Sequence, residues 1–117
     1  MTFPLEALSA AISDRAQTWA RLSMSWHARP IKPNHGKQIV SGDFESESWL
    51  AAITIWSSGE AELEAARLTD GRIVAKHYDL STPDDLDTLL NELVALLTEN
   101  RIPEAAIVVA HEPTAPA

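Results

Sequence analysis

The side chains that could serve as nucleophiles, general bases or metal ligands are scattered along this chain. The four histidines are His27, His35, His77 and His111. No two of them have the four-residue spacing of a helical zinc motif, so the sequence predicts no metal site. Ser57, Ser58 and Gly59 bring two hydroxyl groups together, but the strand-to-helix turn that activates a nucleophilic serine is missing. These three residues therefore predict a turn and not a catalytic site.

Glu60, Glu62 and Glu64 recur at every second position and place three carboxylates on one face of a predicted strand. Two carboxyl groups can carry out the acid–base chemistry of glycoside hydrolysis. That chemistry needs a desolvated cleft that shifts the pKa of one group, and nothing around these glutamates predicts such a cleft. The chain has no cysteine, which excludes thiol chemistry. We expect no catalytic residue and no cofactor, and a protein that is not an enzyme.

The charge of the chain is distributed unevenly. The net charge is −8, and residues 1–41 contain five Lys and Arg against two Asp and Glu. Residues 42–117 contain four basic residues against fifteen acidic ones. Such a surface repels phosphate backbones and anionic membranes and attracts basic proteins. The charge therefore favours a protein partner over nucleic acid or membrane, with solubility alone as the other explanation for the acids.

The absence of cysteine and the hydropathy of the chain indicate in which cellular compartment the protein is found. The absence of cysteine fits a reducing environment. The first residues lack the basic and apolar regions of a signal peptide, and no apolar stretch approaches the roughly 20 residues that span a bilayer. We therefore expect a soluble, cytoplasmic protein.

A hairpin with Gly59 in its turn must position the three glutamates. A three-residue loop over 57–59 pairs Trp56 with Glu60 and Ile53 with Leu63. One face of this hairpin is then apolar and consists of Ala51, Ile53, Ile55, Ala61, Leu63 and Ala65. The opposite face carries Ala52, Thr54, Trp56, Glu60, Glu62 and Glu64. A slip of one residue would bury three carboxylates, so the register is well specified.

Four strands are predicted after residue 37. They are Gln38–Phe44, Trp49–Trp56, Glu60–Leu68 and Arg72–Leu80. Two registers are open for the last strand, which follows a turn at residues 70–71. A two-residue turn places Tyr78 opposite Leu63. A bulge or a longer loop would instead bury Ile73 and Ala75.

The chain before these strands is predicted to form a helix over 4–21, a short strand over 22–28 and a loop over 30–36. The helix is indicated by apolar residues spaced three and four apart. They are Leu5, Leu8, Ile12, Ala16 and Trp19. The loop is indicated by its prolines and its glycine.

The most strongly patterned element is a helix with Thr82 as its N-cap. Pro83 is tolerated in the first turn, and Asp85 can complete a capping box. A continuous apolar stripe follows, made of Leu86, Leu89, Leu90, Leu93, Leu96 and Leu97. Asn100 and Pro103 end the helix.

The order of helix, strands and helix predicts an α+β fold. We expect an antiparallel sheet of four to five strands, with the N-terminal and C-terminal helices packed on one face and the other face open. Residues 105–110 form either a last strand or a packed tail. A single domain is expected over 1–112, followed by a frayed tail over 113–117.

The open face of the hairpin has the elements of a protein-binding surface. Tryptophan is a common interface anchor, and acidic residues speed association with a basic partner. The candidate partner-binding residues are Trp56, Glu60, Glu62, Glu64, Asp43 and Glu45. The alternative is a solvated outer face on which Trp56 packs under the next strand or a loop.

Residues 39–97 resemble a known family. The similar pieces follow in order without an evident gap: Ile53-Thr-Ile-Trp56, Ser58-Gly-Glu60, Leu63-Glu64, Asp70-Gly71, His77-Tyr78 and Ser81 through Leu90. An acidic-Phe-acidic strand end at residues 43–45 precedes them. This pattern is similar to that of the TriTu-type immunity proteins of bacterial polymorphic-toxin and contact-dependent growth inhibition systems.

The resemblance implies an immunity protein that binds a cognate toxin domain and blocks its active site or its use of a cellular cofactor. Many such toxins are nucleases, whose substrate-binding surfaces are basic, and an acidic inhibitor would mimic the charge of the substrate. We expect a monomer or a weak dimer. The alternative is an acidic secretion chaperone for an effector protein, which would dimerise and expose hydrophobic grooves.

Overall fold

The alternation of apolar and polar residues from Lys37 onward produces four long strands, joined by tight turns. A computed structural model describes residues 2–109, so His111 and the tail predicted over 113–117 lie outside the described residues. The long strands are β3 (Lys37–Glu45), β4 (Trp49–Trp56), β5 (Glu60–Arg67) and β6 (Ile73–Asp79). Each pairs antiparallel with the next, which confirms the predicted succession of strands.

Three short strands extend this sheet at its edges. β1 (Ser25–Ala28) and β2 (Lys32–Asn34) both pair with β3, and β7 (Ile107–Val109) pairs with β6. Within the described residues the sheet therefore has seven antiparallel strands, slightly more than the four to five predicted. The predicted loop over 30–36 contains β2, whose Pro33 is compatible with an edge strand because its missing N–H group faces no neighbour there.

The predicted N-terminal helix over 4–21 is two short helices, α1 (Ala7–Ser13) and α2 (Ala16–Arg21). The break lies at Arg15, whose backbone leaves the helical region with φ −105° and ψ 21°. The carbonyl of Ile12 accepts hydrogen bonds from the N–H of Arg15 at 3.0 Å and from the indole of Trp19 at 2.9 Å. The apolar periodicity survives the break, which is why the sequence pattern did not reveal it.

The hairpin of β4 and β5 has the predicted register, with Ile53 opposite Leu63 and Ile55 opposite Ala61. The register of β6 differs from both alternatives, because Tyr78 lies opposite Ala61. The turn is longer than two residues, and the N–H of Gly71 donates to the carbonyl of Arg67 at 2.8 Å. The added length shifts β6 by two positions while its even-numbered residues still face the helices.

Helix α3 (Pro83–Glu99) confirms the predicted C-terminal helix and its capping box. The carboxylate of Asp85 accepts hydrogen bonds from the backbone N–H groups of Ser81 at 2.7 Å and Thr82 at 3.0 Å. Asn100 ends the helix in the left-handed conformation. All six leucines of the predicted stripe are buried.

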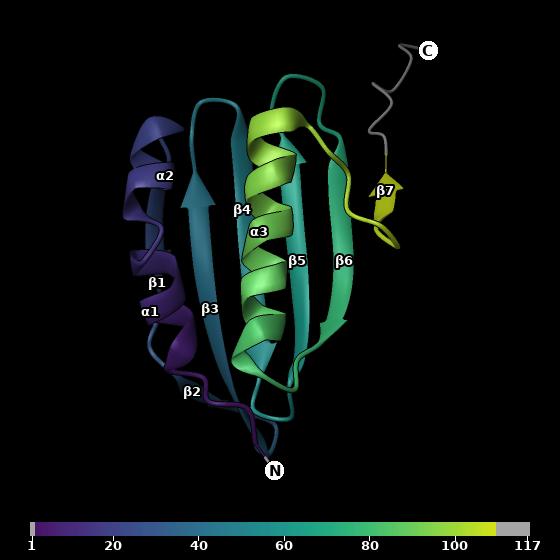
Figure 1. The fold of residues 1–117 in the computed structure, drawn as a ribbon. Coiled ribbons are helices and arrows are strands. Elements are labelled where there is room, and N and C mark those ends of the chain that lie inside the picture. The colour runs from purple at the N-terminus through teal and green to yellow at the C-terminus, as the bar shows by residue number, and fades with distance from the viewer. Residues whose placement is uncertain (1, 110–117) are drawn as a thin grey trace.

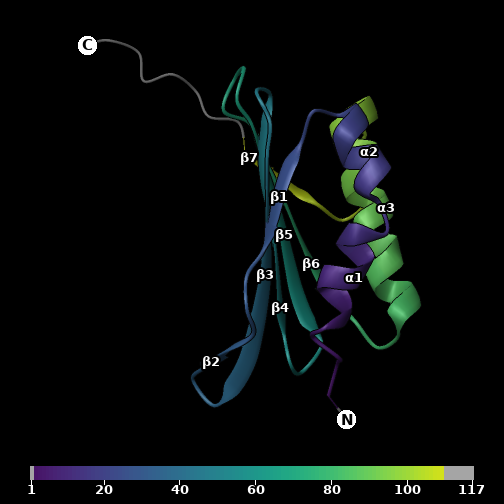
Figure 2. The ribbon, with the colours of Figure 1, turned by 90° about the vertical axis from the view of Figure 1, so that its left-hand side faces the viewer.

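The three helices within residues 2–109 pack on one face of the sheet, and none of them lies over the opposite face (Figures 1 and 2). The core lies between these two layers and includes the apolar face of the β4–β5 hairpin. Gly42 on β3 allows α1 to approach closely, since a Cβ atom there would lie 2.8 Å from Cδ1 of Ile12. In the described part of the chain, no helix combines the length and the apolar character needed to cross a membrane.

Candidate partner-binding face

The outward-facing side chains of β3 to β6 form one continuous surface, which we call the open face. Its members follow from the pairing register and the alternation of side chains. They include Asp43, Glu45, Leu50, Ala52, Thr54, Trp56, Glu60, Glu62, Glu64, Ala66, Ile73, Ala75, His77 and Asp79. All six residues singled out from the sequence are among them, so the fold brings these residues together on one side of the sheet.

Several carboxylates of the open face have a cationic neighbour within the chain. Nε of Arg29 lies 2.6 Å from Oδ2 of Asp43, and Nζ of Lys37 lies 3.9 Å from Oε2 of Glu60. These four side chains are between 39% and 59% exposed, so such pairs add little to stability. Their effect is to reduce the local negative charge at Asp43 and Glu60.

His77 lies between two carboxylates of the open face. Its Nδ1 is 3.2 Å from Oε1 of Glu62, and its Nε2 is 3.1 Å from Oδ1 of Asp79. These two contacts, with Glu62 first, raise the pKa of His77 above the ordinary value of histidine. His77 is therefore more readily protonated than a free histidine and then offsets part of the charge of its two neighbours.

Trp56 is half-buried at the end of β4. It lies opposite Ile39 of β3, whose side chain is buried. Part of Trp56 thus stays accessible to solvent.

The other end of the open face is apolar, which the sequence analysis did not predict. Leu50, Ile73, Ile107 and Val109 are between 40% and 67% exposed. The register places Leu50 near Ile73 and Ile73 opposite Val109, in one row across the sheet. For Leu50 a signal was present, because the alternation that faces Ala52 outward also faces Leu50 outward. For Ile73 no such signal existed, since the register of β6 was open.

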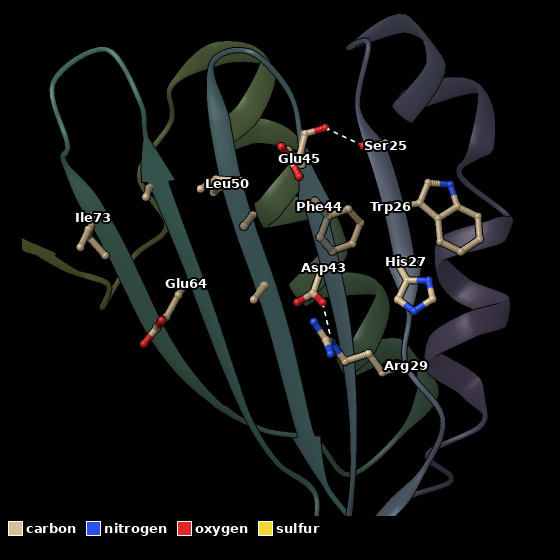
Figure 3. A pocket seen from close by; sticks show the side chains of 13 residues that line it. Ser25, Trp26, His27, Arg29, Asp43, Phe44, Glu45, Leu50, Glu64 and Ile73 are labelled. Atoms are coloured by element: carbon tan, nitrogen blue, oxygen red, sulfur yellow. Dashed lines mark hydrogen bonds and ion pairs between the residues drawn. The ribbon is translucent and has the colours of Figure 1, made fainter.

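A hollow of about 510 Å³ lies on the open face beside this apolar end (Figure 3). Its lining comes from five strands and includes Ser25 and His27 of β1 as well as β3 to β6 residues. Two small side chains, Ala52 and Ala66, lie in the middle of the sheet between larger neighbours. The hollow exists because these alanines leave space that a larger side chain would fill.

The side chains of the open face are suited to binding a partner surface that is charged and partly apolar. Among residues 2–109, no group of three or more His, Cys, Asp and Glu side chains is arranged to hold a metal ion. The side chains of the open face come from neighbouring strands of a well-packed sheet, so their spacing is fixed before any partner arrives. Rigid presentation of this kind lowers the entropy lost on association.

The structure is an α+β fold whose open face combines acidic and apolar side chains opposite helices α1, α2 and α3. Residues 9–96 match the family described as immunity protein TriTu. The chain therefore belongs to the TriTu family of immunity proteins. The match confirms the resemblance seen over 39–97 and extends it into the N-terminal helices. No curated protein and no solved structure matches the chain.

Proposed function

We propose that this immunity protein neutralises a cognate bacterial toxin domain by binding it with the open face, in the cytoplasm of the cell that produces both. The observation that supports this most strongly is the position of the six candidate residues. Trp56, Asp43, Glu45, Glu60, Glu62 and Glu64 come from three strands and share the face opposite helices α1, α2 and α3. The role requires binding alone and no catalytic step by this chain.

The charge of the open face supports a basic toxin surface as the partner. Three carboxylates on β5 and two on β3 produce a negative potential that steers a basic protein toward the face. A toxin that acts on nucleic acid needs a basic substrate-binding surface. We therefore propose a nuclease toxin whose active site the open face covers.

Co-expression with the toxin domain tests the proposed role. The C-terminal domain of the protein encoded immediately upstream is expressed alone and together with this chain, and growth and complex formation are measured. We expect growth arrest by the domain alone, and rescue with a one-to-one complex when this chain is present. A complex without toxicity would point to a secretion chaperone, and failure to bind the domain would contradict the proposal.

Charge removal on the open face tests the proposed interface. We expect the triple variant Glu60→Gln, Glu62→Gln and Glu64→Gln to bind the toxin domain about tenfold more weakly or worse. Its affinity should also depend less on salt, because fewer charges remain to be screened. Isothermal titration calorimetry at two salt concentrations measures both effects.

A matched control removes three charges from the helix layer. The residues are Glu6, Asp14 and Glu99, all exposed. Replacing them with their amides changes the net charge by the same amount as the β5 triple variant. We expect affinity and salt dependence close to those of the wild type. Equal effects of the two triple variants would show that only net charge matters and that the open face is not the interface.

A further inference from the structure

Glu45 and Glu64 differ from the other four carboxylates of the open face. Asp43, Glu60, Glu62 and Asp79 each lie near a cationic or titratable side chain of the chain itself. The carboxylates of Glu45 and Glu64 have no hydrogen-bond or ion-pair partner among the side chains of residues 2–109. Both side chains are exposed to solvent.

These two carboxylates line the same hollow (Figure 3). In one row of the register, Ala52 lies between Asp43 and Glu64. In the next row, Ala66 lies between Leu50 and Ile73, and Leu50 lies opposite Glu45. The hollow thus has a floor of small side chains, with apolar side chains and the carboxylates of Glu45 and Glu64 around it.

The nearest cation does not fill this space. Arg29 reaches the hollow from the end of β1, where its Nε donates to Oδ2 of Asp43 at 2.6 Å (Figure 3). That contact pairs Asp43 and leaves Glu64, in the same row, with no ion-pair partner among the side chains of residues 2–109. Arg29 therefore shows that a guanidinium can reach this part of the sheet. It binds Asp43, which is one of the three carboxylates that line the hollow.

We propose that the hollow receives an arginine side chain of the toxin domain, an inference that rests on the proposed function. Its methylene stem lies over Ala52 and Ala66, and its guanidinium binds Glu64 or Glu45. Apolar residues beside that arginine pack on Leu50 and Ile73. An arginine fits this site better than a lysine, because a guanidinium is planar, weakly hydrated and able to bind a carboxylate through two N–H groups.

Because Leu50 and Ile73 lie beside the hollow, we expect this end of the open face to contribute most to the affinity for the toxin domain. Interface residues that contribute most to binding lie in pockets from which neighbouring side chains exclude water. A charge pair at Glu64 would gain from this exclusion, whereas Glu62 is already engaged by His77. The hollow therefore carries more of the binding energy than the carboxylates beside Trp56.

Affinity measurements with four variants test this proposal. An inactive form of the toxin domain is titrated with Glu64→Gln, Glu45→Gln, Ala66→Phe and, as the control, Glu99→Gln, after circular dichroism and urea unfolding show each variant to be folded. Ala66→Phe fills the hollow without changing charge. We expect Glu64→Gln and Ala66→Phe each to weaken binding tenfold or more, Glu45→Gln to weaken it several-fold, and Glu99→Gln to leave it within twofold of the wild type.

A double-mutant cycle identifies the toxin residue. Each arginine of the toxin domain is replaced by alanine and combined with Glu64→Gln. We expect one arginine whose loss no longer weakens binding once Glu64 is changed, and whose replacement by lysine restores only part of the affinity. Coupling to a lysine in place of an arginine would overturn the assignment of the cation.

The outcomes separate this proposal from the proposed function. If the wild type binds and the Glu64→Gln, Glu45→Gln and Ala66→Phe variants bind equally well, the hollow proposal is wrong and the immunity function stands. If Ala66→Phe weakens binding but neither Glu64→Gln nor Glu45→Gln does, the hollow receives an apolar side chain and the proposed arginine is wrong. If the wild type does not bind at all, the proposed function fails and this proposal fails with it.

Discussion

The hydroxyl of Tyr78 on β6 donates a hydrogen bond of 2.6 Å to Oε1 of Glu92 on α3. Nζ of Lys76 binds the same carboxylate at 2.9 Å and lies 4.7 Å from the centre of the Tyr78 ring. These contacts join the last long strand to the helix layer, on the side of the sheet opposite the open face. Substitutions that remove these contacts should therefore lower the free energy of unfolding without changing the affinity for the toxin domain.

Replacing Tyr78 with phenylalanine removes this hydrogen bond and keeps the ring. We expect the free energy of unfolding to fall by about 1.5–3 kcal/mol, as for other hydrogen bonds to a charged group. Urea unfolding measures the change. Affinity for the toxin domain should stay at the wild-type value, and a loss of affinity without loss of stability would place the interface on the helix side.

The ionisation of Tyr78 can be followed directly because it is the one tyrosine of the chain. Burial, followed by the hydrogen bond to Glu92, raises the pKa of Tyr78 far above the ordinary value. The unfolded chain releases this proton near pH 10 and the folded chain does not, so stability should fall as the pH rises above about 10. Absorbance at 295 nm should show no phenolate near pH 10 without denaturant, and an ordinary titration in urea.

His77 should titrate above the ordinary histidine pKa of about 6.5. Its contribution to stability is present below that ordinary pKa and is lost as the pH rises through the raised value. NMR titration of its ring protons measures the pKa, and Glu62→Gln should lower it. Deprotonation makes the open face more negative, so affinity for a basic toxin should rise across the same pH range.

Gly59 is required by the turn between β4 and β5. Its φ is +97°, and a Cβ atom there would lie 2.4 Å from the carbonyl oxygen of Leu80. We expect Gly59→Ala to lower the free energy of unfolding by about 2–4 kcal/mol, from backbone strain and this clash. Gly36→Ala is the matched control, since its φ is +84° with no atom within 4 Å of the added Cβ. Equal losses for the two variants in urea unfolding would refute a role for Leu80.

The sequence predicted the parts of this fold that depend on local patterns. Strict alternation and the short turn at Gly59 determined the hairpin register, because a slip of one residue would place Glu62 or Glu64 opposite the buried Ile53. The leucine stripe and the Thr82 cap determined α3 in the same way. The register of β6 was not predictable, because Ile73 and Val74 are both apolar and the length of the turn before them decides which one is buried.

The acidic part of the candidate site could be predicted from the sequence because it depends on a local pattern, whereas the hollow could not. Glu60, Glu62 and Glu64 face outward by alternation alone, and their position on the open face follows from one hairpin. The hollow depends on side chains from five strands, including Ser25 of an edge strand far away in the sequence. Its lining therefore requires knowledge of which strands are neighbours, and no local pattern contains that information.

The separation of the two faces also bears on how this protein can diverge. Substitutions at exposed positions away from special backbone features usually change stability by less than about 0.5 kcal/mol. Leu50, Glu64 and Ile73 can therefore be exchanged with little effect on the core formed by the buried residues of the same strands. A lineage can acquire specificity for a different toxin through single substitutions on this face, while every intermediate remains a folded protein.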